Sequence, residues 1–316
     1  MRRSRTIVYK EYATLIFLVI TIAFFSIFAS NFLSVSNLMN VLRQVSIQGI
    51  CSVGMMLVIL TGGIDLSVGS VIGLTGTLTA YLMVKAGLPM FPAILIGMLA
   101  AVCVGVINGL CVTLLSIPPL ITTLATMTGV RGICYIITGG ISIYGFPKGF
   151  SALGQGYLGI VPIPVLCMLG VLLLGGFLLT QRPYGTYLYS LGGNAEAARL
   201  CGINVKKTLI ATYVLNGLFA GFAGIVLLSR VNTGPANLGD GYEMDIITAV
   251  VLGGVSVSGG EGKIKGVVAG VLIIGILSNG LLIMGISEYY QMLIKCCVLL
   301  LAVGFDKNVG KLKKEV

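Results

Sequence analysis

Long apolar runs recur along almost the whole chain, and most are about as long as a membrane-spanning helix. A helix needs about 20 apolar residues to cross the hydrocarbon core of a bilayer. Of the 316 residues, 57% are hydrophobic and 9% are charged, as expected when most of the chain lies in lipid. The sequence therefore predicts an all-α polytopic membrane protein. Its expected spans, about ten in number, are 14–34, 41–60, 68–85, 91–115, 120–139, 160–180, 208–229, 244–257, 264–284 and 289–305.

The eighth of these runs, 244–257, is the weakest. It is short, and it begins beside Glu243 and Asp245. Charged residues are costly within the bilayer, so a full span is hard to place there. We expect a tilted or half-length helix in this region.

The distribution of basic residues predicts the orientation. Cytoplasmic loops carry an excess of Lys and Arg. With the N-terminus in the cytoplasm and ten spans counted off, the basic residues between spans fall mostly inside, and only Lys85, Lys148 and Arg230 fall outside. Both termini are therefore expected in the cytoplasm of a bacterium, with the chain in its cytoplasmic (inner) membrane. The net charge of +10 fits this orientation and anionic lipid, without nucleic-acid binding.

The sequence lacks the residues that several kinds of chemistry require. The chain has no histidine, which excludes imidazole bases and His-ligated metals. It also has no G-x-x-x-x-G-K-[ST] loop for binding ATP phosphates. We expect a transport protein and not an enzyme, with no metal site and no cofactor of its own. If ATP drives transport, another polypeptide supplies the ATPase site.

One polar segment, 182–207, separates two apolar spans. Within it Asn194 is a good helix N-cap, and Glu196 places negative charge in the first turn, where the helix dipole favours it. Gly202 can take the left-handed conformation that ends a helix. The segment is expected to form one short capped helix on the cytoplasmic surface, where a soluble partner can dock.

A polar, glycine-rich break follows the second span and contains Gly62, Gly63, Asp65 and Ser67. The glycines permit unusual backbone angles, and Asp65 and Ser67 can cap the third span. A bare carboxylate near mid-membrane costs about 2.5–3.5 kcal/mol. Asp65 is therefore expected either near the cytoplasmic surface or with polar partners. Two roles stay open, a structural cap and a direct place in the transport path.

A similar break ends the eighth span at Gly253 and Gly254. Many transporters are built from internal repeats and bind substrate near discontinuous helices. The two breaks therefore suggest either a repeat or a coincidence between two glycine-rich turns.

Isolated polar residues inside spans are the remaining candidates for a substrate pathway. Asn108, Asn216 and Asn279 lie in apolar surroundings, where each needs a hydrogen-bonding partner. With Asp65 and Ser67 they form the candidate pathway set, and interhelical hydrogen bonding is the alternative. Close helix packing is expected at small-xxx-small pairs. These are Gly69 and Gly73, Gly105 and Gly109, Gly217 and Gly221, and Gly266 and Gly270.

Several motifs together carry a resemblance to a known family. Glu196-Ala197-Ala198, followed after three residues by Gly202, looks like the EAA loop of ABC importer permeases. The chain as a whole, read as one transmembrane permease domain over 1–316, resembles the ribose-type sugar permeases. The matching blocks are 61–69, 192–194 leading into 202–205, 241–243 leading to 251–254, and 289–292.

This resemblance implies a homodimeric or pseudo-dimeric translocation core in the membrane, with a second copy of this chain or a related permease as the other half. It also implies an ABC ATPase subunit that uses ATP and Mg²⁺, and an extracytoplasmic sugar-binding protein. By the resemblance, the helix in 182–207 is the coupling helix that sits in a groove of the ATPase. Its matching positions, with the flanking cap and the charged residue beside them, are Asn194, Glu196, Ala197, Ala198, Arg199 and Gly202.

Ala197 and Ala198 have small side chains, so we expect the helix to approach the ATPase closely at these two residues. Glu196 and Arg199 are expected to hydrogen-bond or pair with the same partner. The function that follows is ATP-driven import of ribose or a related monosaccharide.

Three alternatives remain. One is a permease for another small solute, such as a nucleoside, a furanose signal or a branched-chain amino acid. The others, which the sequence disfavours, are a passive channel and an ion-coupled secondary transporter, which generally needs charged residues within the membrane. Asp65, Arg43, Arg131 and Lys295 come near the spans, with no obvious pairing among them.

Overall fold

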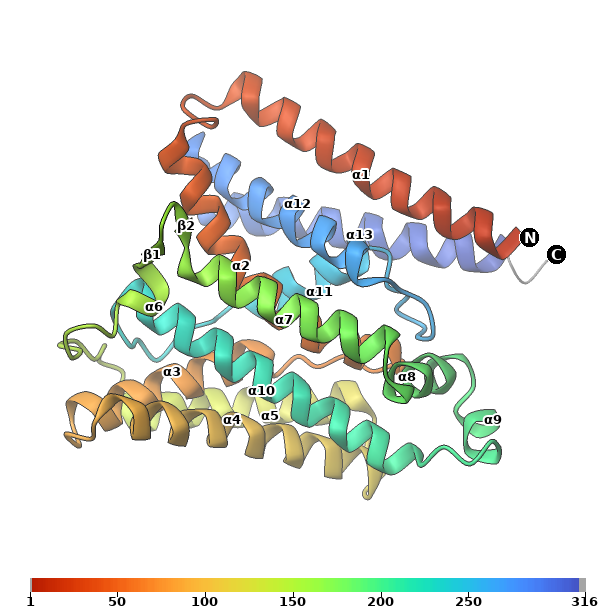
Figure 1. The fold of residues 1–316 in the computed structure, drawn as a ribbon, viewed down its shortest axis with the longest axis horizontal. Helices are drawn as coiled ribbons and strands as arrows, with labels where there is room; N and C mark the ends of the chain where they lie inside the picture. The colour runs from red at the N-terminus through yellow and green to blue at the C-terminus, as the bar shows by residue number, and fades with distance from the viewer. Residues whose placement is uncertain (1, 313–316) are drawn as a thin grey trace.

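The computed structural model describes residues 2–312, and the side chains of residues 14–304. The described chain is mostly helical (Figure 1). The helices are α1 (Arg2–Phe28), α2 (Val35–Leu60), α3 (Val68–Val84), α4 (Met90–Thr113), α5 (Pro119–Thr138), α6 (Ala152–Gln155), α7 (Ile163–Thr180), α8 (Pro183–Gly193), α9 (Ala195–Leu200), α10 (Val205–Val231), α11 (Tyr242–Leu252), α12 (Ile264–Ile283) and α13 (Glu288–Leu312). Two short antiparallel strands, β1 (Tyr157–Leu158) and β2 (Val161–Pro162), form a hairpin before α7.

Six of the described helices are long and apolar enough to cross a membrane: α2, α4, α5, α7, α10 and α12. The other four predicted spans coincide with α1, α3, α11 and α13. Of these, α3 has 17 residues, and the apolar part of α1 is Thr14–Phe28. The chain is thus an all-α, multi-pass membrane protein. The count of ten spans stays a prediction.

The predicted end of the first span is wrong. The first span does not continue to residue 34, because α1 ends at Phe28 and Asn31 has a positive φ of 61°. Ser34 then caps α2, where its Oγ accepts a hydrogen bond from the amide of Asn37 at 3.3 Å. In the eighth span, α11 has only 11 residues, as expected for a half-length helix.

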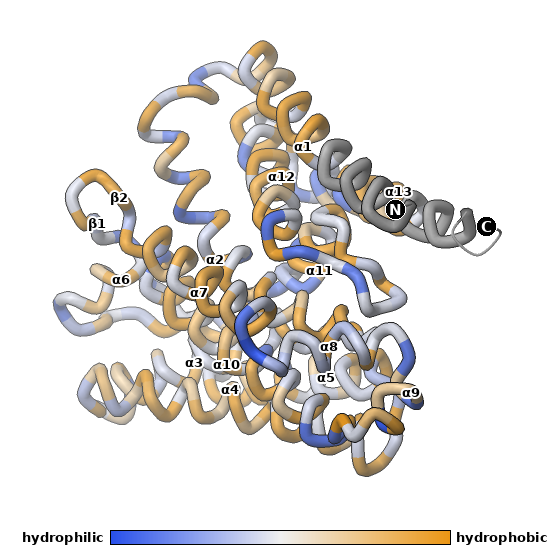
Figure 2. The backbone as a smooth tube through the Cα atoms, turned by 45° about the vertical axis from the view of Figure 1, so that its right-hand side comes forward, coloured by the Kyte–Doolittle hydropathy of each residue, from blue (hydrophilic) through white to orange (hydrophobic). Residues whose placement is uncertain are grey.

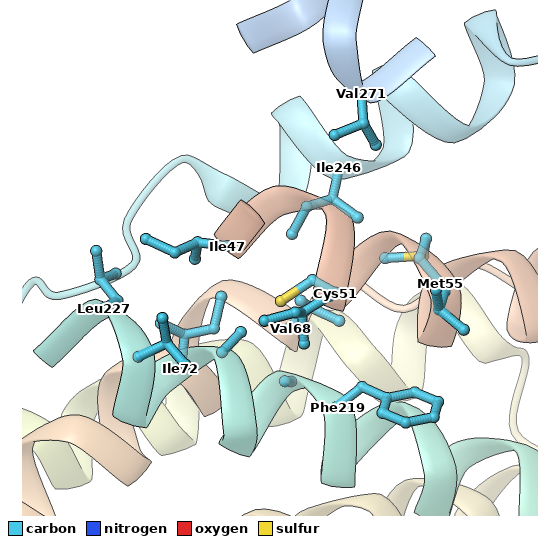
Figure 3. Close-up of a cluster of buried hydrophobic side chains, with 14 of the residues drawn as sticks. Ile47, Cys51, Met55, Val68, Ile72, Phe219, Leu227, Ile246 and Val271 are labelled. Carbon is cyan, nitrogen blue, oxygen red and sulfur yellow. The ribbon is translucent and has the colours of Figure 1, made fainter. Parts of the chain in front are cut away.

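The core of the fold surrounds α2. Every residue from 45 to 60 in α2 is buried, and the helix contacts α10, α12, α7 and α11. Figure 3 shows Cys51 and Met55 of α2 between Phe219 of α10 and Ile246 of α11. A helix that is apolar all round is expected inside a bundle rather than at its surface.

Small residues bring α4 and α10 together, as the small-xxx-small pairs predicted. A Cβ added to Gly217 would lie 2.6 Å from the carbonyl oxygen of Ala101, and one added to Gly109 would lie 2.9 Å from the Cα of Ile210. Such distances leave no space for a side chain, so the two backbones are nearly in contact. The same close approach occurs between Gly270 of α12 and α11.

The long helices run roughly parallel, so that the loops gather at two opposite ends. In Figure 1 the free ends of α1 and α13 lie on the same side as α9, and α6, β1 and β2 lie on the other. Figure 2 shows apolar colour along helices such as α4, α7 and α10, with polar segments beside α9. The predicted topology requires both termini and the polar segment 182–207 to lie at the same end of the bundle. Which side faces the cytoplasm stays a prediction.

Candidate functional site

The predicted capped helix in the polar segment is present as α9. Asn194 is its N-cap, and its Oδ1 accepts a hydrogen bond from the amide of Ala197 at 3.0 Å. Gly202 has a φ of 85°, in the left-handed region, just after the helix. The amide of Ile203 then donates to the carbonyl oxygen of Ala198 at 3.1 Å. Both predicted caps are confirmed.

The expectation of a single helix over 182–207 is wrong. A second helix, α8, precedes α9, and Asn194 separates them in an extended conformation. Pro183 starts α8 at a position where a proline is well tolerated. The helix is anchored to the bundle by Tyr184, which shares a 2.8 Å hydrogen bond with Thr212 of α10, and by Tyr189, which donates to the carbonyl oxygen of Gly262 at 2.9 Å.

The charged pair of α9 is internal to the helix. The Nε of Arg199 donates to Oε2 of Glu196 at 3.1 Å, and its Nη2 donates to Oε1 at 2.5 Å. This two-bond contact lowers the pKa of Glu196 below its ordinary value and raises the pKa of Arg199. Both side chains are exposed. In the isolated chain, Glu196 and Arg199 are therefore already paired with each other.

The two alanines of α9 face different ways. Ala197 is exposed, whereas Ala198 is buried against its own chain, so Ala197 is the alanine that presents its side chain at the surface. The sequence reasoning also missed Leu200, whose side chain is 76% exposed at the end of α9. The sequence signal for Leu200 is that it is a large apolar residue in a short helix whose other residues are small or charged. An exposed leucine beside Ala197 gives the helix an apolar contact point.

The first helix break is a buried polar cluster. Gly62 takes a positive φ of 81°, and the chain then turns into the bundle. Oδ1 of Asp65 accepts hydrogen bonds from the amide of Ser67 at 2.8 Å and from its hydroxyl at 2.6 Å. Oδ2 accepts from Nδ2 of Asn216 at 2.8 Å, and Asn108 donates to the hydroxyl of Ser67 at 2.9 Å. All four side chains are at most 3% exposed.

Four of the five candidate pathway residues thus meet in one place, contributed by the break, α4 and α10. Asp65 lies within the bundle and has polar partners, which was one of its two predicted environments. The fifth residue, Asn279, is elsewhere, and it exchanges two 2.9 Å hydrogen bonds with Asn37 of α2. The polarity of the five residues did not indicate that Asn279 lies apart from the other four.

The two glycine-rich breaks contact each other. The amide of Gly260, in the loop after α11, donates to the carbonyl oxygen of Leu60 at the end of α2. Gly254 has a φ of 86°, whereas Gly253 has an ordinary φ of −68° and a backbone in contact with Gly266 of α12. Gly253 is therefore required for close packing and Gly254 for the turn.

Each of the three basic residues near the spans has a partner elsewhere in the chain. Lys295 of α13 donates to Oδ2 of Asp245 of α11 at 2.8 Å. Arg131 of α5 donates to the carbonyl oxygen of Leu238 at 2.9 Å. Arg43 of α2 lies over the ring of Tyr157, with its guanidinium carbon 4.7 Å from the ring centroid, and donates to the Tyr157 hydroxyl. These partners lie far away in sequence, so no local pattern predicts them.

Potential metal ligands do not gather within the part of the chain that the structure describes. No group of three or more His, Cys, Asp and Glu side chains is placed there to hold an ion.

A family model described as the permease component of branched-chain amino acid transport systems matches residues 37–303. The matched range contains both helix breaks, the polar segment 182–207 and the Asp245–Lys295 pair. The chain belongs to this permease family. It is a transport subunit and not an enzyme, and a multi-pass protein of the bacterial inner membrane.

Curated members of the permease family are similar over nearly their full length. The chain is 41% identical to the ribose import permease protein RbsC of Haemophilus influenzae, over 96% of this chain and 95% of that protein. It is 42% identical to RbsC of Bacillus subtilis, over 92% and 91% of the two chains. It is 37% identical to the L-arabinose transport system permease protein AraH of Escherichia coli, over 98% and 94%. No solved structure matches the chain.

Proposed function

We propose that this chain is the membrane-spanning subunit of an ATP-driven importer that carries ribose or a related monosaccharide into the cytoplasm. The observation that carries the proposal is the 41% identity to a ribose import permease over 96% of the chain. The relative named for L-arabinose, at 37% identity, supports a monosaccharide as the substrate class. Permeases named for ribose are the more similar of the two kinds.

The energy source in this proposal is a separate ABC ATPase that binds ATP and Mg²⁺. The exposed helix α9 is the surface for its docking, with Ala197 and Leu200 as apolar contacts. Asn194 and Gly202 hold the helix in shape. The Glu196–Arg199 pair lies on the exposed surface and can exchange partners when the ATPase binds.

Transport then follows alternating access between inward-open and outward-open states. Closure of the ATPase around ATP moves α9, and α8 carries the movement to the bundle, because its end at Gly192 packs against Leu60 and Gly260. A ligand shifts such an equilibrium only through different affinities for the two states. Rigid-body movement of packed helices is the expected form of the change.

Two further partners belong to the proposal. An extracytoplasmic binding protein delivers the sugar on the side of β1 and β2. A second copy of the chain completes the translocation core as a homodimer. The exposed apolar side chains of α5 and α13, such as Ile136 at 82% and Leu301 at 74%, face either lipid or that copy.

For the buried cluster we propose a structural role. Asp65 fixes the start of α3, and Asn108 and Asn216 tie that point to α4 and α10. A place in the transport path is the other interpretation. The close glycine packing of α4 against α10 beside the cluster favours the structural one.

The description of the family model keeps another small solute, a branched-chain amino acid above all, as the alternative substrate. A nucleoside and a furanose signal belong to the same alternative. An ion-coupled carrier is less well supported, because the charges near the spans already have protein partners.

Uptake of radiolabelled ribose tests the proposal. Cells express the chain with its ATPase and binding protein, and a matched strain carries a catalytically inactive ATPase. Uptake only with the active ATPase is the expected result, with competition by unlabelled pentoses but not by leucine. Uptake that persists with the inactive ATPase contradicts an ATP-driven importer. Uptake of leucine in place of any monosaccharide contradicts the substrate class.

A further inference from the structure

A cavity of ≈ 870 Å³ lies between α2, α11, α12 and α13. Small-molecule pockets in proteins are commonly about 300–1,000 Å³, with a largely apolar lining and a few convergent polar groups. Apolar lining comes from side chains such as Met292 and Leu299. The polar lining comes from all four helices and includes Gln48, Asp245, Thr248, Ser278, Gln291 and Lys295.

The Asp245–Lys295 pair in this wall has unused hydrogen-bonding capacity. Lys295 at 2.8 Å and Nε2 of Gln48 at 3.1 Å both donate to Oδ2 of Asp245. Among the described residues none donates to Oδ1, and the Lys295 ammonium uses one of its three N–H groups. The two side chains are 13% and 23% exposed. A free acceptor and free donors therefore lie side by side at the cavity.

We propose that this cavity is a contact site for the transported sugar within the permease, an inference that rests on the proposed function. One sugar hydroxyl donates to Oδ1 of Asp245, and a neighbouring hydroxyl accepts from the ammonium of Lys295. Each hydroxyl both donates and accepts, which matches a wall with one free acceptor and free donors. Gln48 is a positioning residue, because its amide holds the Asp245 carboxylate from the side of α2.

The paired charges in the wall favour a polar ligand. The carboxylate of Asp245 and the ammonium of Lys295 cancel, so neither a cation nor an anion gains a net attraction from this pair. The lining also includes Asp240, which lies 3.8 Å from the guanidinium of Arg131, and Glu288. A lipid tail would leave the charged groups without hydrogen bonds, and burying unpaired polar groups is costly. A polyhydroxy compound satisfies both charged groups at once.

The position of the cavity also fits a sugar that arrives from outside. Its lining includes Tyr242 at the start of α11, and Gly285 and Glu288 at the turn between α12 and α13. The predicted topology places both of these points on the extracytoplasmic side. A sugar released by the binding protein would therefore meet the cavity in the outer half of the membrane.

A thiol-protection experiment tests the site in the wild-type complex. Cys296 of α13 lines the cavity and is exposed, whereas Cys103 of α4 is exposed and is not among the lining residues. The complex of permease, ATPase and binding protein is treated with N-ethylmaleimide, with ribose or with potassium chloride of equal osmolarity. Mass spectrometry then gives the alkylation rate at each cysteine. Cys103 serves as the internal control.

Protection of Cys296 alone is the expected result. At a ribose concentration about ten times the Kd, occupancy slows its alkylation about tenfold. Equal rates at Cys296 with and without ribose, in a complex that imports ribose, would overturn the inference and leave the proposed function intact. Import of no monosaccharide at all would instead contradict the proposed function.

Transport kinetics give a second test. Lys295→Met removes the donors and is expected to raise the KM for sugar about tenfold, the effect of losing a hydrogen bond to a charged group. Lys295→Arg keeps a charged donor and is expected to restore most of the affinity. If both variants, at normal membrane levels, lower only the maximal rate and leave KM unchanged, the pair has a structural role and the inference is wrong.

Discussion

The amide of Gly260 donates a hydrogen bond of 2.9 Å to the carbonyl oxygen of Leu60, which joins the loop after α11 to the end of α2. Gly192, near the end of α8, packs against both of these groups. Three segments far apart in sequence thus meet immediately before α9. In the proposed coupling mechanism, a displacement of α9 is expected to reach both helix breaks through this contact.

Gly192→Ala is expected to abolish most ATP-driven uptake while the chain still inserts. The added methyl would collide with the Leu60 carbonyl oxygen and the Gly260 amide, and neither backbone group can move away independently. Gly193→Ala is the matched control, because a Cβ there meets nothing within 4 Å. Radiolabelled uptake, normalised to membrane level, measures both. Equal uptake by the two variants would contradict a role of this junction in coupling.

Leu200→Ser is expected to weaken association with the ATPase subunit about tenfold or more. Full burial of a leucine side chain contributes about 1.5–3 kcal/mol, and every 1.4 kcal/mol is about a factor of ten. The Kd of purified permease for its ATPase measures the effect. Leu115→Ser provides the control, since Leu115 is 66% exposed after α4 and lies outside the coupling segment. Unchanged affinity in Leu200→Ser would remove this residue from the docking surface.

Asn216→Ala is expected to lower the free energy of unfolding by about 1–3 kcal/mol, because the buried Asp65 carboxylate loses one hydrogen bond. The fall in Tm in detergent measures the loss. Adding Asp65→Asn removes the charge that needed the bond. The double variant should therefore lose less than the sum of the two single losses, and strictly additive losses would contradict the coupling.

Gly217→Val is expected to destabilise the fold by about 1–3 kcal/mol through overpacking, because a Cβ there lies 2.6 Å from the Ala101 carbonyl oxygen. Gly170→Ala in α7 is the reference, since a Cβ at that position meets nothing within 4 Å. Thermal unfolding of the two purified variants compares them. Similar melting temperatures would show that α4 and α10 separate without cost.

The pKa of Glu196 is expected to rise towards its ordinary value in Arg199→Gln, because Arg199 is what lowers it. With a lowered pKa, the pair is present at neutral pH and is lost only as the pH falls through that lowered value. Carboxyl NMR titration of labelled Glu196 gives the pKa. Lys206→Gln, which changes another exposed basic residue of the segment, should leave it unmoved.

The six helices that are long and apolar enough to cross a membrane, and the caps of α9, could be predicted from the sequence, because their causes are local. The length of an apolar run determines whether a helix can cross the bilayer. Asn194 and Gly202 act on backbone groups within three or four residues of themselves. The half-length of α11 was also visible, in the charges at its start. The end of α1 was misplaced because its turn contains apolar residues such as Phe32 and Leu33, which extend the hydropathy signal beyond the helix.

The tertiary structure alone decided which polar groups meet. Asp65 and Asn216 are 151 residues apart, and Lys295 and Asp245 are 50 apart, so no spacing rule connects them. Asn279, like Asn216, is an asparagine within an apolar span, but it pairs with Asn37 of α2. Each of these groups lies among apolar residues and must find a partner, but the packing of the helices around α2 determines which one is within reach.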